Sequence, residues 1–210
     1  MATGIIETDA DVAEGAAWLA SRCDRLAWAL EQTGPLPLRR RPAGFPALLQ
    51  AICGQQLSVA SAAAVWRKLA DRDLTEQAAV AAADDDTLKA CGLSRPKIAY
   101  ARALAAADLD YPGLARMAED DAIAALVAVK GIGLWTAEIY LKFAVGRADV
   151  FAAGDLALQE AARALYGLPE RPSEKTLRAM AQDWSPWRAV AARILWAYYR
   201  VEKSREGIQE

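Results

Sequence analysis

The sequence predicts an all-α protein of roughly ten short helices arranged in two lobes, and three observations carry this prediction. Alanine is very frequent and runs of β-branched residues are rare, so intrinsic propensities favour helix along almost the whole chain. Apolar residues recur at helical spacing within segments that glycine, proline and acidic residues separate. The 210 residues are 54% hydrophobic and 25% charged, which is typical of a folded globular protein.

The first half of the chain is expected to form one long helix followed by shorter ones. An amphipathic helix is predicted at about residues 9–32, with Trp18 and Leu26 among its apolar residues, and the proline-rich stretch TGPLPLRRRP ends it. Two helices joined near Gly54 are expected next, and Ser58 is a suitable cap for the second. Shorter helices are then predicted at residues 75–83, 86–91 and 95–107.

The second half continues the same pattern. The stretch YPGLARMAEDDAIAALVAVK is expected to give a short helix and then another at residues 121–129, followed by helices at residues 134–145 and 155–166. Two more helices are predicted to close the chain. One follows Ser173, and the other is opened by Ser185 with Pro186 at the first helical position.

Composition excludes several kinds of site. Without histidine, the chain has no Ser-His-Asp or Cys-His catalysis and few ways to build a zinc site. Cys23, Cys53 and Cys91 lie far apart, so we expect buried, reduced thiols. No apolar run approaches the about 18–20 residues of a membrane span. The acidic N-terminus lacks the pattern of a signal peptide, so a cytoplasmic protein without membrane contact is expected.

The net charge of −2 counts against a nucleic-acid partner, because such domains are usually basic. Clustering of the basic residues weakens this objection. They gather in two places, at Arg39, Arg40 and Arg41 and at Arg188, Arg193, Arg200, Lys203 and Arg205.

A glycine-rich joint, Lys130-Gly131-Ile132-Gly133, lies between two of the predicted helices. Glycines permit backbone angles that a side chain would forbid, and they allow close approach to a ligand. The following helix begins with free N–H groups at the positive end of its dipole, which favours an anion such as phosphate. Ile132 is expected to plug the joint into the core. On the glycines alone, a tight turn between packed helices is the favoured explanation of the pattern.

Asp155 lies in the small-residue stretch AAGDLAL, at the start of a predicted helix. On position alone it is an N-cap residue, since aspartate is preferred there. A capping position also holds a carboxylate rigidly.

Three motifs together, ICGQQLSVASAA, LVAVKGIGLWTA and VFAAGDLAL, resemble the helix-hairpin-helix (HhH-GPD) DNA glycosylase superfamily. The nearest branch is the compact form of the 3-methyladenine DNA glycosylase II (AlkA-like) enzymes, and the resemblance covers roughly residues 45–196. It implies a two-lobed all-α fold with the active site in the interlobe cleft and without the extra N-terminal β domain of some members. The central lobe is assigned to residues 55–148, and the second lobe to residues 1–54 with 149–210.

The resemblance also implies roles for individual residues. Asp155 would be the catalytic carboxylate, and Gln56 the wedge that fills the gap left by a flipped nucleotide, while Gln55 would tie the helix joint. Ile139 stands where the family usually has an aromatic residue, and Tyr140 follows it. The base pocket would be lined by Trp135 and Trp196. The DNA phosphate would be bound at Gly131, Gly133 and Thr136. A monovalent cation, Na+ or K+, would be held by the backbone carbonyls of Val127, Val129 and Ile132. Four other tryptophans are assigned to the core: Trp18, Trp28, Trp66 and Trp184.

The implied activity is monofunctional base removal from damaged double-stranded DNA by a monomer. Trp135 stands where lyase-competent relatives carry a lysine nucleophile, and tryptophan cannot form a Schiff base. No cysteine follows Cys91, so no iron–sulfur cluster and no required cofactor are expected. A cationic base such as 3-methyladenine leaves without an acid, which suits a chain without histidine.

Three alternatives remain open at this stage. The same fold could act on hypoxanthine, uracil or an oxidised purine, because the pocket decides the base. A non-catalytic helix-hairpin-helix DNA-binding protein would share the hairpin but would need no Asp155. A helical protein-interaction module would suit the acidic charge, but it would leave the three motifs unexplained.

Overall fold

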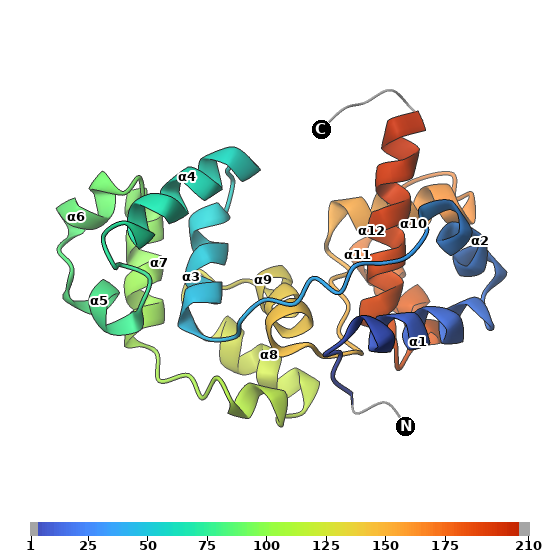
Figure 1. Cartoon of the computed structure of the whole chain (residues 1–210), viewed down its shortest axis with the longest axis horizontal. Helices are drawn as coiled ribbons and strands as arrows, with labels where there is room; N and C mark the ends of the chain where they lie inside the picture. The colour runs from blue at the N-terminus through green and yellow to red at the C-terminus, as the bar shows by residue number, and fades with distance from the viewer. Residues whose placement is uncertain (1–3, 206–210) are drawn as a thin grey trace. The chain divides into compact units, whose positions relative to one another are not determined.

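The computed structural model describes residues 4–205, so the first residues of the acidic N-terminal segment lie outside it. The described part of the chain is all-α and has no β-strand beyond one isolated antiparallel bridge between Ile5 and Arg147 (Figure 1). Within the same range, no helix is both long enough and apolar enough to cross a bilayer. The chain forms two compact units. The split unit consists of Met1–Arg40 and Gly146–Glu210, and the central unit is Arg41–Val145.

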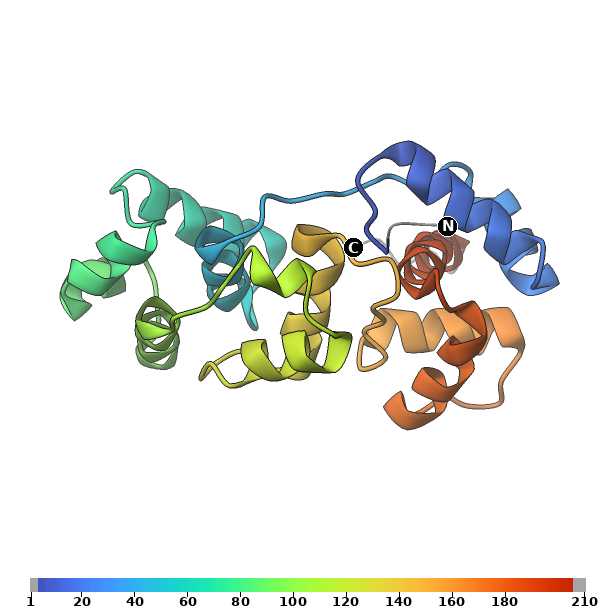
Figure 2. The ribbon, with the colours of Figure 1, turned by 90° about the horizontal axis from the view of Figure 1, so that it is seen from below.

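The split unit is built around its last helix. In Figure 2, which looks nearly along α12, the blue helices α1 and α2 lie on one side of it and the orange α10 on the other. The described helices of this unit are α1 (Asp9–Ala20), α2 (Asp24–Thr33), α10 (Leu156–Tyr166), α11 (Glu174–Met180) and α12 (Arg188–Arg205).

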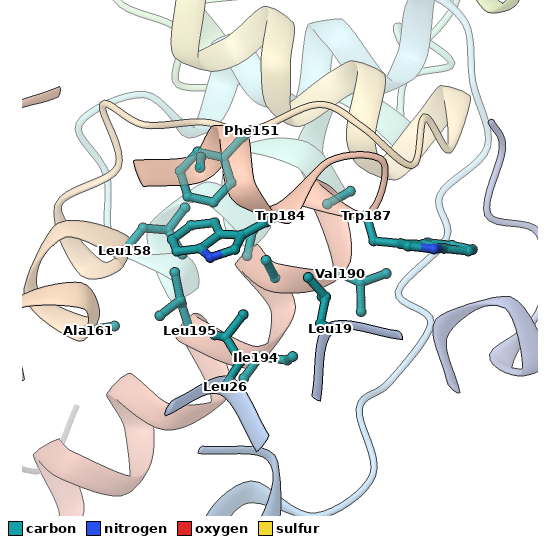
Figure 3. Packing of buried hydrophobic residues seen from close by; sticks show 14 of the residues in the cluster. Leu19, Leu26, Phe151, Leu158, Ala161, Trp184, Trp187, Val190, Ile194 and Leu195 are labelled. Atoms are coloured by element: carbon teal, nitrogen blue, oxygen red, sulfur yellow. The ribbon is translucent and has the colours of Figure 1, made fainter. Parts of the chain in front are cut away.

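The core of the split unit lies between these helices and is rich in aromatic side chains (Figure 3). The Trp184 ring meets Phe151 edge to face, with their centroids 5.3 Å apart. Gly15 of α1 leaves room for Trp187, because a Cβ at Gly15 would overlap the indole. Phe151 belongs to the connection from the central unit back to α10, so its contact with Trp184 packs this connection against the segment that precedes α12.

The central unit consists of shorter helices. Its α-helices are α3 (Phe45–Gly54), α4 (Val59–Ala70), α5 (Gln77–Ala82), α6 (Asp85–Ala90), α7 (Arg95–Ala106), α8 (Glu119–Val127) and α9 (Leu134–Tyr140). Helix α3 contacts α4, α7 and α9, and it buries Leu48, Leu49 and Ile52 completely. These contacts place residues 41–54 in the central unit, whereas the sequence assignment began that unit at residue 55.

Several predicted elements are confirmed by their caps. The joint between α3 and α4 falls at Gly54, and the Ser58 hydroxyl accepts a hydrogen bond from the Ser61 N–H. Ser173 caps α11 in the same way, through the N–H of Thr176.

Three other predictions about elements are wrong. The single helix at residues 9–32 is two helices, because the chain turns at Ser21 and begins again after Cys23 in extended backbone. The helix expected to run to residue 145 changes after Tyr140 into one turn of π-helix, Leu141–Val145. Pro186 does not open α12, which begins at Arg188 after a turn with a cis Ser185–Pro186 peptide.

The tryptophans assigned to the core are buried to different extents. Trp184 is 3% exposed, and Trp18 and Trp66 are half-buried. Trp28 is 43% exposed, so its assignment to the core was wrong. Its ring lies edge-on against Tyr198 of α12, with centroids 5.5 Å apart, which leaves much of the indole in solvent.

Candidate functional site

The glycine-rich joint forms a tight hairpin between α8 and α9 in the central unit. Gly131 has φ +96°, and a Cβ there would overlap the Tyr100 ring, so this glycine is required by the fold itself. Ile132 is 3% exposed, which confirms that it plugs the hairpin into the core. Its N–H donates to the Val129 carbonyl at 3.0 Å and closes the turn.

Gly133 differs from Gly131 in what surrounds it. Its φ of −89° suits any residue, and a Cβ there would meet no atom within 4 Å. It is exposed and serves as the N-cap of α9, just before the N–H groups of the first helical turn. The fold therefore does not require glycine at this position, whereas a ligand that approaches the backbone closely would.

Thr136 lies in that first turn, but its side chain is 6% exposed and lines a cavity. A buried hydroxyl is badly placed for a phosphate in solvent. If Thr136 meets a phosphate as the resemblance implies, its backbone N–H and not its hydroxyl is the group to do so.

The loop between α3 and α4 is joined to the hairpin. The Gln55 side-chain Nε2 donates to the Gly131 carbonyl at 2.9 Å, which supports the structural role expected for Gln55. The next residue, Gln56, is exposed and has φ +56°, in the left-handed region that residues other than glycine rarely adopt. Such strain often marks a functional position. The candidate wedge therefore stands on a loop fixed to the candidate phosphate site.

A cavity of about 520 Å³ opens beside this loop, entirely within the central unit. Ala51 and Gly54 of α3 give it a lining of small residues, and Trp135, which is 46% exposed, gives it an aromatic face. Gln56 stands among its lining residues as well. The residues predicted for the wedge and for one side of the base pocket thus meet at one hollow.

Ile139 stands where the family usually has an aromatic residue, and the structure shows whether Ile139 or Tyr140 lines the cavity there. Ile139 lines the cavity, while Tyr140 is 4% exposed and its hydroxyl accepts a hydrogen bond from the Gly44 N–H at 2.9 Å. Burial raises the pKa of this phenol. Tyr140 therefore anchors the start of α3, and the cavity wall is aliphatic at this point.

Asp155 lies in the split unit as the N-cap of α10. Its Oδ1 accepts a hydrogen bond from the Leu158 N–H at 3.1 Å, so the capping role is confirmed. The same oxygen accepts the indole N–H of Trp196 from α12, also at 3.1 Å. Both bonds go to Oδ1, so this carboxylate oxygen is held between α10 and α12.

The loop that presents Asp155 is braced by a residue that the sequence did not single out. Gln159, 6% exposed on α10, donates from Nε2 to the Ala153 carbonyl at 2.9 Å. The Asp155 N–H itself donates to Ala152. A buried amide four residues after a candidate carboxylate is one helical turn away, and this spacing was the available signal.

The predicted site residues fall into two sets. Asp155 and Trp196 are hydrogen-bonded in the split unit, while Trp135, Gln56 and the hairpin belong to the central unit. The structure brings each set together within its own unit. The interlobe cleft stays a prediction.

Two of the clustered basic residues have structural roles. Arg188 forms an ion pair with Asp149, with Nε 2.8 Å from Oδ1. Arg193 is 3% exposed, and burial together with the charges of Arg39 and Arg40 lowers its pKa from 12.5 to about 10.

Known proteins resemble the chain in sequence. Residues 49–186 match the family model described as HhH-GPD superfamily base excision DNA repair protein. The chain is 28% identical over 200 residues to the alkylbase DNA glycosidase-like protein mag2 of Schizosaccharomyces pombe, covering 90% of this chain and 94% of that protein.

Two solved structures resemble the fold. The DNA-3-methyladenine glycosidase of Bacillus halodurans superposes with a TM-score of 0.79 at 32% identity, over 87% of both chains. The 3-methyladenine DNA glycosylase (Mag1) of Schizosaccharomyces pombe, solved in complex with abasic DNA, gives 0.75 at 26% identity, over 87% of this chain and 95% of that one.

Proposed function

Because this chain belongs to the HhH-GPD superfamily of base excision DNA repair proteins, we propose that it hydrolyses the N-glycosidic bond of alkylated purines in duplex DNA. The observation that carries the proposal is the Asp155 carboxylate, which is held by hydrogen bonds from the Leu158 N–H and the Trp196 indole. The relatives named for 3-methyladenine support the choice of base.

The chemistry needs a fixed negative charge beside the sugar. As the glycosidic bond breaks, its electron pair leaves with the base and positive charge builds at C1′. Asp155 stabilises that charge and orients the water that adds to C1′ and loses a proton. An alkylated purine that is already cationic accepts the electron pair without an acid, so the absence of histidine is no obstacle.

The central unit supplies the grip on DNA. The N–H groups after Gly133 bind a backbone phosphate, and Gln56 enters the duplex where the nucleotide has left. Trp135 offers its exposed ring to the flipped base, and a cationic base gains about 0.5–2 kcal/mol from such a π face.

A monovalent cation fits the hairpin by the chemistry of its donors. Among the residues that the structure describes, no group of three His, Cys, Asp or Glu side chains could hold a metal ion, whereas the hairpin offers backbone carbonyl oxygens. The carbonyls of Val127, Val129 and Ile132 would hold Na+ or K+. The Val129 carbonyl already accepts the Ile132 N–H, and its second lone pair remains. Such an ion would add positive charge next to the phosphate.

Removal of the base alone, without strand cleavage, is part of the proposal. Strand cleavage by this superfamily's lyases needs an amine, and the position matched to that lysine holds Trp135. The product is therefore an intact strand with an abasic site.

Duplexes that each carry one defined lesion test the proposal in single-turnover reactions. The wild-type protein should release 3-methyladenine faster than hypoxanthine, uracil or 8-oxoguanine, with strand breaks only after alkali and no borohydride-trapped adduct. Asp155→Asn should slow release by about 100-fold or more while DNA affinity stays similar or rises, because asparagine caps α10 without the charge.

Asp84→Asn is the matched control. Asp84 is also a capping aspartate, and it accepts the Thr87 N–H at the start of α6. Near-wild-type release by Asp155→Asn would overturn the assignment of Asp155. An efficient borohydride adduct, or 8-oxoguanine as the best substrate, would overturn the proposed chemistry.

A further inference from the structure

The chain segment before the central unit is held against α12 at Leu38. The Leu38 N–H donates to the Asp9 carboxylate at 3.1 Å, and the Leu38 carbonyl accepts from Nη2 of Arg193 at 3.1 Å. The Arg193 guanidinium also donates to the Ala189 carbonyl of its own helix, so it is fixed at both ends. Arg39 and Arg40 follow the pinned residue directly and are both exposed.

The positions of Arg39 and Arg40 are specific. Arg39 has φ 54°, a left-handed backbone that costs free energy in a residue other than glycine. The Arg40 guanidinium lies over Gly146, where a Cβ would overlap Nη1, so this glycine gives the side chain its place. With the described residues, the Arg40 guanidinium makes no hydrogen bond or ion pair.

These residues form a concentration of positive charge, which we call the arginine cluster (Arg39, Arg40 and Arg193). Burial lowers the pKa of the Arg193 guanidinium, and the charges of Arg39 and Arg40 lower it further. Like charges held close together are unfavourable in the free protein, and a bound anion would relieve the repulsion. Guanidinium groups suit phosphate because their planar forks donate two parallel hydrogen bonds.

The arginine cluster and the candidate carboxylate are both joined to α12 within the split unit. Arg193 and Trp196 are three residues apart on α12, about one helical turn, and Trp196 donates to Asp155. Gly146, under Arg40, begins the connection that ends at Asp155. An anion at Arg39 and Arg40 would therefore be bound by the same unit that holds the reacting carboxylate.

We propose that Arg39 and Arg40 bind a phosphate of the DNA backbone next to the nucleotide that Asp155 acts on. The identity of the anion rests on the proposed function, because DNA is the polyanion that this carboxylate would meet. The hairpin phosphate site belongs to the central unit, so the arginine cluster gives the split unit its own contact with the backbone. Arg193 is the positioning residue that fixes Leu38 and hence the two arginines.

The salt dependence of binding to a short undamaged DNA duplex tests the proposal without any base release. The logarithm of the binding constant falls linearly with the logarithm of salt concentration, with a slope of about −0.9 for each phosphate contact. Arg39→Ala and Arg40→Ala should each reduce the magnitude of the slope by about 0.9, and the double variant by about 1.8. At about 0.1 M salt each lost contact should weaken binding about eight-fold, because a slope of about 0.9 over the tenfold change in salt from about 1 M gives a factor of about 8.

Two further variants separate a contact from net charge. Arg22→Ala removes a guanidinium that lies over Trp18 in the same unit, and it should leave the slope unchanged. Arg40→Lys keeps the charge and should keep the slope, with weaker binding at every salt concentration. Thermal unfolding of each variant establishes that the fold is intact.

The outcomes for this inference and for the proposed function are distinct. An unchanged slope in the folded double variant, or an equal change in Arg22→Ala, overturns the arginine cluster even if the protein releases 3-methyladenine. A reduced slope supports the cluster even if no base is released, in which case the proposed function fails alone. Absence of duplex binding by the wild-type protein overturns both.

Discussion

The indole of Trp196 serves two purposes at one position. The resemblance assigned its ring to the base pocket, and the structure adds a hydrogen bond from its N–H to Asp155. A hydrogen bond to a charged group contributes about 1.5–3 kcal/mol, so its loss should lower the rate of base release.

Replacing Trp196 by phenylalanine separates these two roles. Trp196→Phe keeps an aromatic ring but removes the donor, so single-turnover base release should slow by about 10-fold to 100-fold while affinity for undamaged DNA is unchanged. Trp18→Phe, at a half-buried tryptophan of the same unit, is the control and should have no effect on release. Equal rates for Trp196→Phe and wild type would show that the hydrogen bond contributes nothing to the reaction.

Cys53 predicts how stability depends on pH. Burial raises the pKa of its thiol from 9.0 to about 11. The unfolded chain then loses this proton at lower pH than the folded one, so the contribution to stability is complete below pH 9 and is lost as the pH rises towards 11. The loss should be about 2–3 kcal/mol.

Urea unfolding under reducing conditions at several pH values between about 8 and 11 measures this effect. Cys53→Ala should show a smaller fall in the free energy of unfolding over that range, whatever its stability at pH 8. A parallel decline in both proteins would mean that the thiol titrates normally in the folded state.

At the scale of single elements, the two hairpin glycines should respond differently to alanine. Gly131→Ala forces a side chain onto φ +96° and onto Tyr100, so it should lower the free energy of unfolding by about 1–3 kcal/mol. Gly133→Ala meets open space and should leave stability unchanged, yet it should weaken binding to damaged and undamaged duplexes alike. Thermal unfolding and equilibrium DNA binding measure the two effects. Full DNA affinity in Gly133→Ala would reduce the hairpin to a turn between helices.

The elements also show what the sequence can and cannot predict. Caps such as Ser58 and Asp155 were predictable because they act through hydrogen bonds to residues three positions along the chain. The break after Ser21 and the exposure of Trp28 depend on how α1 and α2 pack against α12, which no local pattern contains.

The same distinction between local patterns and tertiary packing holds for the candidate site. Asp155, Trp135 and Gln56 were found because the motifs around them are contiguous in sequence. The bond from Trp196, the burial of Thr136 and the burial of Arg193 join residues that are distant in sequence or depend on neighbouring helices. Only tertiary structure reveals such roles.

At the scale of the whole molecule, the central unit is continuous in sequence whereas the split unit is not, and this difference leads to a prediction. The central unit is one uninterrupted stretch with its own buried core, so a fragment of residues 41–145 should fold alone. It should be helical by circular dichroism and unfold cooperatively, with an enthalpy of about 60–80 kcal/mol. It should bind duplex DNA weakly and release no base, because it lacks Asp155. A fragment without cooperative unfolding would show that the central unit depends on the rest of the chain.

The divided unit sets an order in time during synthesis. The split unit needs α12 to complete its core and to supply the indole that orients Asp155. Trp196 is translated 51 residues after Val145 (196 minus 145), which takes about 3–10 seconds at ribosomal speeds. A growing chain therefore completes the central unit before the position of the Asp155 carboxylate is fixed. Under the proposed function, a polypeptide that ends before α12 would occupy DNA without removing bases, so the damaged bases would stay in place.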